Sequence, residues 1–525
     1  MGKLRTARAK IAFGDFQTPP DLASAVCRAL AAAGVAPRSL LEPTCGEGSL
    51  LLAALDAFPT IRQAHGLEIN PTHVDHLRAR LAERRLDARV DITCASFFAH
   101  DWPNHLDRLA GPLLVLGNPP WVTSADLGSL GSDNLPTKTN LRNLPGIEAL
   151  TGKSNFDISE WIFNYLLTRL GGRAATVAML CKTAVARKVL ASAWSADLPL
   201  HAASLRRIDS ARHFAASVDA CLTIIELAGR PGPQVCPVYA DLEATTPEST
   251  LAVRDGRLIA DATLYDRRRA LLGASPYKWR SGVKHDCAAL MEFFNNADGR
   301  LQNGAGETPR LEQHCLYPLI KSSDLARAGT ASPRRWMLVT QSRVGEDTTI
   351  IKDTATNTWR YLQRHRERFD RRASAIYRGK PPFAIFGVGD YTFAPWKVAI
   401  SGLYKTLKFR KIGPHAGKPV VLDDTCYFVA CTSEPEADLL IVLLNSEAAH
   451  EFYRAFIFWD SKRPITADLL DRLDLRALAA ELGLAAELAR LRPPPRAPGS
   501  DRHIGQSSGT SRRTRAAGSS SRSTV

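Results

Sequence analysis

Apolar and polar positions follow two distinct rhythms between residues 20 and 230. Apolar residues recur with helical spacing in the segments 20–34, 70–86 and 157–172, which predicts amphipathic helices. Short runs that are almost wholly apolar lie near residues 39–42, 64–68, 89–94, 111–117, 173–180 and 220–229. Runs without strict alternation are typical of strands buried on both faces. The order of these segments predicts a mostly parallel α/β sheet with helices on both faces.

The pattern changes in the second half of the chain. From about residue 265 to 480 the apolar runs are shorter, turns are frequent, and Lys and Arg stand beside aromatic residues. This predicts a second, α+β domain. The last segment is rich in Pro, Ser, Gly and Arg and has almost nothing to bury, so we expect disorder there. We therefore expect an α/β domain over residues 1–240, a second domain over 265–490 and a disordered basic tail over 491–525.

The net charge of the 525-residue chain is strongly positive, at +15. Seven Arg and one Asp in the tail account for +6 of it, and the remainder is still basic. A basic chain favours an anionic partner, nucleic acid first. We expect no membrane partner, because no apolar run is long enough to cross a bilayer. The ten cysteines form no Cys-x-x-Cys pair and no zinc-finger spacing, which indicates buried thiols in a reducing cytoplasm and no metal site.

The stretch "LLEPTCGEGSL" combines an acidic strand end, a glycine turn and a helix start. Gly46 and Gly48 would let a ligand approach the backbone, and the following helix start favours polar groups. Glu68 ends the next strand, where doubly wound folds place an acid against ribose hydroxyls. Together they predict a nucleotide-type cofactor, whereas the glycines alone could form an ordinary turn. The stretch "GIEALTGKS", residues 146–154, resembles a P-loop but has one residue too many between its glycines, so we expect no ATP site.

The stretch "GNPPW", residues 117–121, follows a buried strand at the sheet edge where α/β proteins bind ligands. The exocyclic amine of a nucleobase is a poor nucleophile, because its lone pair is delocalised into the ring. Two acceptors on its N–H groups, the side-chain oxygen of Asn118 and the carbonyl of Pro119, could free that lone pair. The prolines would hold these acceptors rigidly, and Trp121 could stack on the base. The alternative is a capped turn whose Trp121 packs in a core.

In this order, the glycine loop, Glu68 and the NPPW turn resemble the amino-methyltransferases that make N6-methyladenine in DNA. The resemblance is to the gamma class of bacterial restriction–modification systems, and it covers about residues 11–230. It implies a Rossmann-like S-adenosylmethionine-dependent methyltransferase domain with a C-terminal target-recognition domain. The implied reaction moves the methyl group of S-adenosylmethionine to N6 of a flipped adenine in double-stranded DNA. Such an enzyme would be a cytoplasmic monomer in a bacterium, with a cognate restriction endonuclease as a candidate partner.

The resemblance also assigns roles to individual residues. Phe214 matches a second aromatic that closes on the flipped base, although it could equally be a core residue ahead of a strand. Ser96 stands where the family has an acid that holds the cofactor's adenine, so either its hydroxyl substitutes or Asp101 reaches in. The cofactor-binding residues implied are Gln17, Thr18, Pro19, Glu42, Thr44, Gly46, Glu68, Ile69, Ser96, Phe97 and Asn118.

The second half of the chain resembles the family's target-recognition segments more loosely. Its candidate DNA-binding residues are Lys284, Lys405, Lys408, Arg410 and Lys411, with Tyr404 and Phe409 interleaved. These cations could neutralise phosphates, or they could form an ordinary solvated face. Two other functions stay open at this point. One is the same chemistry on an RNA base or a glutamine amide, and the other is a catalytically silent DNA-binding specificity protein, which the Ser96 departure would favour.

Overall fold

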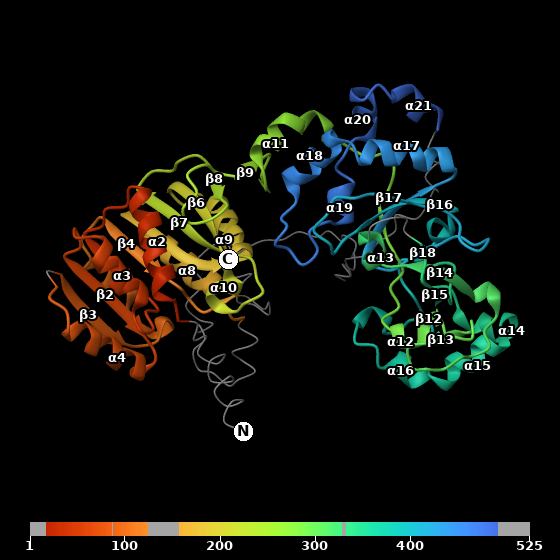
Figure 1. Ribbon diagram of the computed structural model, residues 1–525, viewed down its shortest axis with the longest axis horizontal. Coiled ribbons are helices and arrows are strands. Elements are labelled where there is room, and N and C mark those ends of the chain that lie inside the picture. Colours follow the sequence, from red (N-terminus) through yellow and green to blue (C-terminus); the bar gives the residue numbers. More distant parts are fainter. Residues whose placement is uncertain (1–16, 87, 124–156, 328–331, 492–525) are drawn as a thin grey trace, which may run out of the picture.

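The computed structural model describes residues 17–86, 88–123, 157–327 and 332–491 (Figure 1). The tail expected over 491–525 lies, apart from Leu491, outside the described residues, and so does the P-loop-like stretch at 146–154. Within the described ranges, no helix is both long and apolar enough to cross a membrane. All ten cysteines are free thiols, and eight of them are buried.

The described strands of the first half form one ten-stranded sheet in the order β10-β9-β8-β6-β7-β5-β4-β1-β2-β3. Neighbouring strands from β3 to β5 are parallel, and β7 lies antiparallel between β5 and β6. The strands are β1 (Ser39–Glu42), β2 (Gln63–Glu68), β3 (Arg89–Cys94), β4 (Leu113–Gly117), β5 (Ala174–Lys182), β6 (Leu200–Ile208), β7 (Ala220–Ala228), β8 (Val235–Tyr239), β9 (Ser249–Arg254) and β10 (Arg257–Ile259). The predicted α/β fold class is confirmed.

Helices cover both faces of this sheet (Figure 1). Leu40 and Leu114 pack in one core with α2 and α3, while their neighbours Leu41 and Val115 pack in a second core with α8 and α9. Adjacent strand residues point to opposite faces, so burial of both faces explains the non-alternating apolar runs. The helices are α2 (Pro20–Ala32), α3 (Ser49–Ala57), α4 (Pro71–Ala82), α5 (Trp102–Asp107), α8 (Ile158–Leu170), α9 (Thr183–Ser195) and α10 (Ser210–Phe214).

The second half contains two smaller sheets, β11-β19-β16-β17 and β13-β12-β15-β14-β18. Their strands are β11 (Arg280–Ser281), β12 (Glu292–Asn295), β13 (Leu301–Asn303), β14 (Leu316–Ile320), β15 (Arg335–Leu338), β16 (Trp396–Ser401), β17 (Arg410–Ile412), β18 (Val421–Leu422) and β19 (Cys426–Cys431). The helices are α11 (Ala262–Arg268), α12 (Ala288–Met291), α13 (Ser322–Ala326), α14 (Ile351–Thr354), α15 (Thr356–Arg364), α16 (Arg366–Asp370), α17 (Glu434–Leu444), α18 (Glu447–Phe456), α19 (Ala467–Leu470), α20 (Leu475–Glu481) and α21 (Ala485–Arg490). This mixture matches the predicted α+β class.

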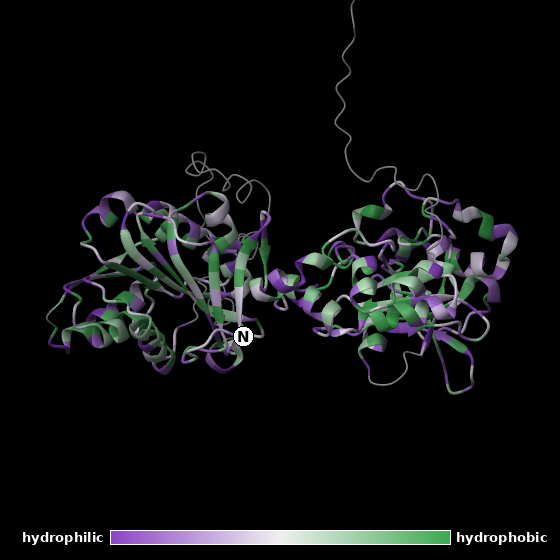
Figure 2. Cartoon of the chain, turned by 90° about the horizontal axis from the view of Figure 1, so that it is seen from above, coloured by the Kyte–Doolittle hydropathy of each residue, from purple (hydrophilic) through white to green (hydrophobic). Residues whose placement is uncertain are grey.

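The two halves form separate lobes in both views (Figures 1 and 2). The first sheet continues through β9 and β10 past residue 240, and the chain enters the second lobe at α11. Arg187 on α9 pairs with Asp460 at 2.7 Å, and its guanidinium also lies 4.2 Å from the ring centre of Phe458. Both charged side chains are largely buried, so this pair is a buried contact between the two lobes.

Candidate functional site

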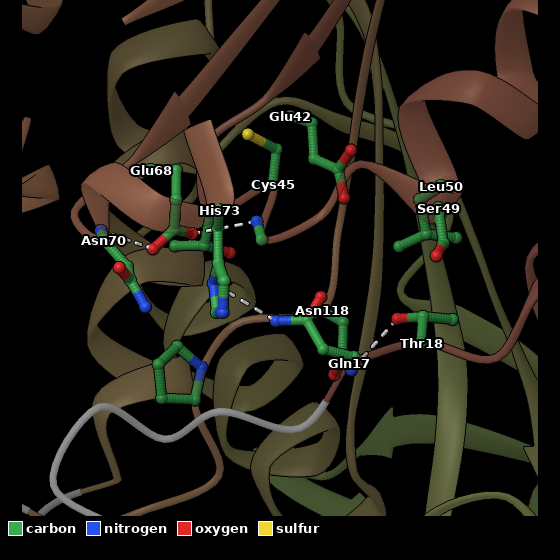
Figure 3. A pocket seen from close by; sticks show the side chains of 13 residues that line it. Gln17, Thr18, Glu42, Cys45, Ser49, Leu50, Glu68, Asn70, His73 and Asn118 are labelled. Carbon is green, nitrogen blue, oxygen red and sulfur yellow. Dashed lines mark hydrogen bonds between the residues drawn. The ribbon is translucent and has the colours of Figure 1, made fainter. Parts of the chain in front are cut away.

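A pocket opens at the carboxyl ends of β1 and β4, where the chain order of the strands runs in opposite directions (Figure 3). Open α/β sheets bind their ligands at such a switch point. Segments far apart in the sequence meet here. The lining residues are Gln17, Thr18, Glu42, Thr44, Cys45, Gly46, Ser49, Leu50, Glu68, Asn70, His73, Asn118 and Pro120.

The glycine loop between β1 and α3 is tightly packed. Gly46 and Gly48 both have positive φ angles, +51° and +78°. A Cβ on Gly48 would lie 2.3 Å from Leu77 Cδ1, and one on Gly46 would lie 2.5 Å from Gln17 Oε1. Any residue other than glycine is therefore disfavoured at both positions, because the φ angle is positive and a Cβ atom would contact a neighbouring side chain too closely. The loop brings its backbone directly against the pocket.

Glu68 ties this loop to the end of β2. Its Oε2 accepts a hydrogen bond from the backbone N–H of Gly46, and its Oε1 accepts one from that of Asn70, each at 2.8 Å. Each carboxylate oxygen has two acceptor positions, so one on each remains for a ligand hydroxyl. Glu68 thus holds the loop in place and can still accept from a ribose.

Glu42 lies deeper, with 2% of its surface exposed. Its Oε2 accepts the backbone N–H of Leu51 at 2.9 Å, in the first turn of α3. Burial raises the pKa of Glu42 well above its usual range, and the N–H of Leu51 offsets part of that effect. A buried carboxylate of this kind favours a cationic ligand group, such as the ammonium of a bound amino acid.

This burial gives a prediction for Glu42→Gln. Because the folded-state pKa is raised, ionised Glu42 costs stability as pH rises through that pKa. The neutral variant should melt at a higher temperature than wild type at neutral pH without cofactor, yet gain far less stability when cofactor is added. In wild type, cofactor affinity should fall as pH drops through the raised pKa, because the protonated carboxyl no longer attracts an ammonium. Thermal unfolding across the acidic and neutral range, with and without cofactor, measures both effects.

The control for this prediction is Asp56→Asn on the same helix, α3. The side chain of Asp56 is 63% exposed and pairs with Arg84 on the surface. Its substitution should leave both the pH profile and the cofactor-induced shift as in wild type. Equal stability of the Glu42→Gln variant and wild type across the whole pH range would contradict the assignment.

Asn118 faces the same pocket from the end of β4. Its Nδ2 donates to Thr18 Oγ1 at 3.2 Å, and Thr18 is buried. Nearby, Gln17 Oε1 accepts the N–H of Glu47 at 2.9 Å, and its Nε2 lies 3.5 Å from His73 Nδ1. The bond to Thr18 orients the Asn118 amide, so its oxygen points the other way. Segment 17–18 and the NPPW turn are therefore joined at the pocket.

The lining fits S-adenosylmethionine by its chemistry. Glu42 offers a buried carboxylate for an ammonium, Glu68 offers acceptors for a ribose, and the glycine loop offers close backbone contact. Thr44 Oγ1 is buried and has no hydrogen-bond partner within the described ranges, which marks a polar position for a ligand to satisfy. These features suit a ligand that carries both an amino acid and a nucleoside.

The structure does not bring every predicted cofactor residue to this pocket. Ser96 Oγ accepts the N–H of Phe98 at 3.2 Å and caps a short 3₁₀ turn. Phe97 is buried against Trp102, with ring centres 4.6 Å apart. Asp101 is exposed and caps α5, where hydrogen bonds from Asn104 lower the pKa of Asp101. Ser96, Phe97 and Asp101 are not among the residues that line this pocket.

Two further predicted residues lie at the margin. Ile69 is half-buried and its carbonyl accepts the Cys94 thiol at 3.8 Å, while Pro19 precedes α2 as its N-terminal cap. Sequence reasoning missed Asn70 and His73, which line the pocket. The pair Asn70–Pro71 carries a signal for this, because Asn before Pro marks a helix start, and a helix that follows β2 starts at the ligand edge.

The two predicted aromatics lie together. The rings of Trp121 and Phe214 are 5.0 Å apart at 64°, in direct edge-to-face contact. Trp121 is 9% exposed, and its Nε1 donates to the carbonyl of Leu180 at 3.2 Å. No planar base fits between rings in contact, so base stacking requires Phe214 to move. In this conformation Trp121 packs in a core, as the alternative interpretation expected, while its partner Phe214 is half-buried.

Four of the five predicted DNA-binding cations already have protein partners. Lys411 pairs with Glu434 and Asp438, and Arg410 donates to the backbone carbonyl of Leu325. Lys284 pairs with Asp286, and Lys405 reaches across to Asp219 in the first lobe. Lys408 is exposed and makes no ion pair in the part of the chain that the structure describes. Phe409 is buried, whereas Tyr404 is 43% exposed. Three of the five cations, Lys284, Lys405 and Lys411, are therefore paired with carboxylates in this conformation.

A hollow of about 540 Å³ lies where the two lobes meet. The first lobe contributes Lys182, Ala184 and residues of the segments 207–211 and 216–220, around Phe214. The second lobe contributes Lys405, Asp460 and Lys462. Both lobes thus contribute residues to a hollow at the edge of the sheet where the NPPW turn also lies. Lysines are among these lining residues.

Comparisons with known proteins give concordant results. The chain is 42% identical over 473 residues to the type II methyltransferase M.NspV of Nostoc sp., which spans 90% of this chain and 98% of that protein. It is 31% identical over 115 residues to the type II methyltransferase M.XamI of Xanthomonas campestris pv. amaranthicola, or 22% of this chain and 21% of that one. The fold is similar to that of the type IIL restriction-modification enzyme MmeI, solved in complex with DNA, with a TM-score of 0.52 and 13% identity over 87% of this chain and 66% of that chain. No protein-family model matches the chain.

Proposed function

Because the chain belongs to the type II methyltransferases, we propose that it methylates N6 of a specific adenine in duplex DNA, as the modification enzyme of a restriction–modification system. Its cofactor is S-adenosylmethionine, which supplies an electrophilic methyl group when bound. The observation that carries the proposal is the position of Asn118, hydrogen-bonded to Thr18 and lining the cofactor pocket. Asn118 of the NPPW turn therefore lies at the wall of the proposed cofactor pocket.

In this proposal, the residues of the NPPW turn bind and orient the target amine. The Asn118 oxygen and the Pro119 carbonyl accept the two N–H groups of adenine N6, which withdraws the lone pair from the ring and aims it at the methyl donor. Pro119 and Pro120 fix the turn, because their φ angles cannot vary. Preorganised acceptors act on the positive charge that develops on the amine during transfer, so they lower the barrier rather than only binding the substrate.

Duplex DNA is the proposed partner because of the second lobe. The relation to MmeI, which was solved with DNA, supports it, and the hollow between the lobes places Lys405 and Lys462 on the side of Phe214. A smaller acceptor, such as a protein amide, would not need a lobe of this size. A base inside a helix cannot reach the pocket, so the target adenine has to leave the stack.

The test of the function is transfer of tritiated methyl groups to duplex DNA and, in parallel, to total RNA. Expression in a host without DNA methylation, followed by single-molecule sequencing, identifies the modified base and its sequence context. N6-methyladenine at one recurrent sequence supports the proposal. Label in RNA alone, or in cytosine, would replace it with a different amino-methyltransferase. Cofactor binding without transfer to any nucleic acid would indicate a silent specificity protein.

Phe214→Ala tests the second aromatic. Aromatic stacking on a base contributes about 1–3 kcal/mol, so transfer to a matched duplex should fall by roughly 5- to 150-fold. Cofactor affinity should stay near wild type, because Phe214 does not line the cofactor pocket. Single-turnover rates and cofactor titrations separate the two quantities. Phe214→Tyr serves as the control, since it keeps the ring and should retain most of the activity.

A further inference from the structure

Three exposed apolar side chains lie around the junction of the lobes. Val218, Leu403 and Tyr404 are 40%, 36% and 43% exposed. Val218 lines the hollow between the lobes together with Lys405, the residue that follows Tyr404. Leu403 and Tyr404 form one wall of a second hollow, of about 500 Å³, in the second lobe beside Asp424 and Thr425. Leu403 and Tyr404 are therefore two adjacent, partly exposed apolar residues, a feature that can mark an interaction surface.

The tip formed by Leu403 and Tyr404, between β16 and β17, is held rigidly. Ser401 Oγ accepts the backbone N–H groups of both tip residues at 3.2 Å. The N–H of Gly402 donates to the carbonyl of Thr425 at 2.9 Å, and a Cβ at Gly402 would lie 2.7 Å from the ring of Tyr427. The tip backbone is therefore anchored beside β19, and its two apolar side chains are partly exposed to solvent.

The tip is also fastened to the segment that carries Phe214. Lys405 Nζ lies 2.8 Å from Asp219 Oδ2, five residues after Phe214 in the sequence. Ser210 Oγ donates to the carbonyls of Ala216, at 2.9 Å, and Val218, so the segment from 210 to 219 closes on itself. An ion pair at the surface therefore links the residue after the tip to the segment that carries Phe214.

Charges of both signs lie around the tip. Lys405 is 55% exposed, and Lys408 and Lys462 are exposed without an ion pair in the described ranges, while Asp286, Glu292, Asp423 and Asp424 line the second hollow beside the tip. Cations can hold phosphates while apolar side chains between them enter the stack of bases, which is how wedge residues of other DNA-binding proteins act. Charge complementarity therefore favours a nucleic acid duplex over a second copy of this basic chain.

We propose that Leu403 and Tyr404 enter the duplex at the target base pair and fill the space left when the adenine moves to Asn118. They would pack against the base that has lost its partner and so stabilise the open state. This rests on the proposed function, because it assumes a paired target base. Leu403 and Tyr404 are positioning residues, since they act on the DNA rather than on the reacting atoms.

The experiment compares wild type with the double variant Leu403→Ser/Tyr404→Ser on two duplexes that carry the mapped site. One duplex is fully paired, and the other has an abasic site opposite the target adenine, so no pair has to open and no base is left alone. The variant should lose about 10- to 100-fold in methylation rate on the paired duplex and keep a near wild-type rate on the abasic one. With 2-aminopurine at the target position, its fluorescence increase should fall in parallel. Leu482→Ser, which changes an apolar residue 38% exposed elsewhere in the second lobe, is the matched control and should behave as wild type.

Three outcomes would contradict the proposed insertion of Leu403 and Tyr404 into the duplex. Wild-type rates of the double variant on the paired duplex would remove any role for the tip. Equal losses on both duplexes would indicate a general defect in folding or DNA binding. A change confined to the oligomeric state in sedimentation would assign the tip to contacts between copies of the chain. Failure of wild type to methylate either duplex would instead refute the proposed function itself, so the two failures are distinguishable.

Discussion

Asn118→Ala is expected to reduce methyl transfer by about 10²- to 10³-fold, the effect of removing one preorganised hydrogen-bonding group from a transition state. The variant loses the oxygen that we propose accepts an N–H of the target amine. It also loses the Nδ2 bond to Thr18 Oγ1 that joins the NPPW turn to segment 17–18. Single-turnover methylation at saturating DNA and cofactor measures the rate. Isothermal titration measures cofactor affinity, which should fall much less than the rate.

Thr18→Val is the graded companion of this variant. It removes the partner of the Asn118 amide and leaves the amide itself, so the oxygen is present but less well oriented. We expect the methylation rate to fall by about tenfold, because one hydrogen bond that orients the amide is lost. Full activity of Asn118→Ala would rule out the mechanism in which Asn118 holds the amine. Equal losses of activity in the two variants would show that Asn118 only supports the pocket through its hydrogen bond to Thr18 and does not contact the substrate.

Glu68→Ala is expected to lower cofactor affinity by about 10²-fold or more, because hydrogen bonds to a charged group contribute about 1.5–3 kcal/mol each. Glu68 accepts the backbone N–H groups of Gly46 and Asn70 at the pocket wall. Its removal leaves both donors without their partner, loosens the glycine loop and deletes the acceptor for a ribose. Cofactor titration gives the affinity, and chemical denaturation gives the accompanying loss of stability.

A matched control is Glu83→Ala, at the exposed C-terminal cap of α4. This substitution also removes a glutamate carboxylate, but from the end of the neighbouring helix and outside the pocket. Cofactor affinity should therefore be unchanged. Glu68→Gln separates charge from geometry, because it keeps one acceptor oxygen. If Glu68→Ala bound cofactor as tightly as wild type, the pocket at the ends of β1 and β2 would not be the cofactor site.

The fold was predictable where burial governs the sequence. Leu40 and Leu41 are both fully buried because they face different helix layers, and that double burial is visible as a non-alternating run. Glu42, Glu68 and Asn118 end parallel strands, so the strand order alone brings them to one edge. The pocket they share follows from topology rather than from the details of any one loop.

Side-chain direction was not predictable in the same way. Phe97 packs against Trp102, five residues away, and against Trp161, which is far along the chain and could not be identified as its partner from the sequence. Lys411 was a candidate for phosphate binding, but Glu434 and Asp438, more than 20 residues along the chain, take up its charge. Such partners come from tertiary contacts that one sequence does not reveal.

The route by which the chain leaves the first sheet bears on how target specificity diversifies. The exit strand is β10, at one edge of the sheet, and the pocket lies between β4, β1 and β2, towards the other edge. Ile259 at the end of β10 already packs in the core of the second lobe. A lineage could therefore replace or reshape the lobe that begins there, or an engineer could graft another one. Five strands separate this exit point from the cofactor pocket, and the contacts of Lys405 with Asp219 and of Asp460 with Arg187 would have to be rebuilt. Under the proposed function, new DNA target sequences would be acquired by exchanging this lobe rather than by rebuilding the catalytic domain.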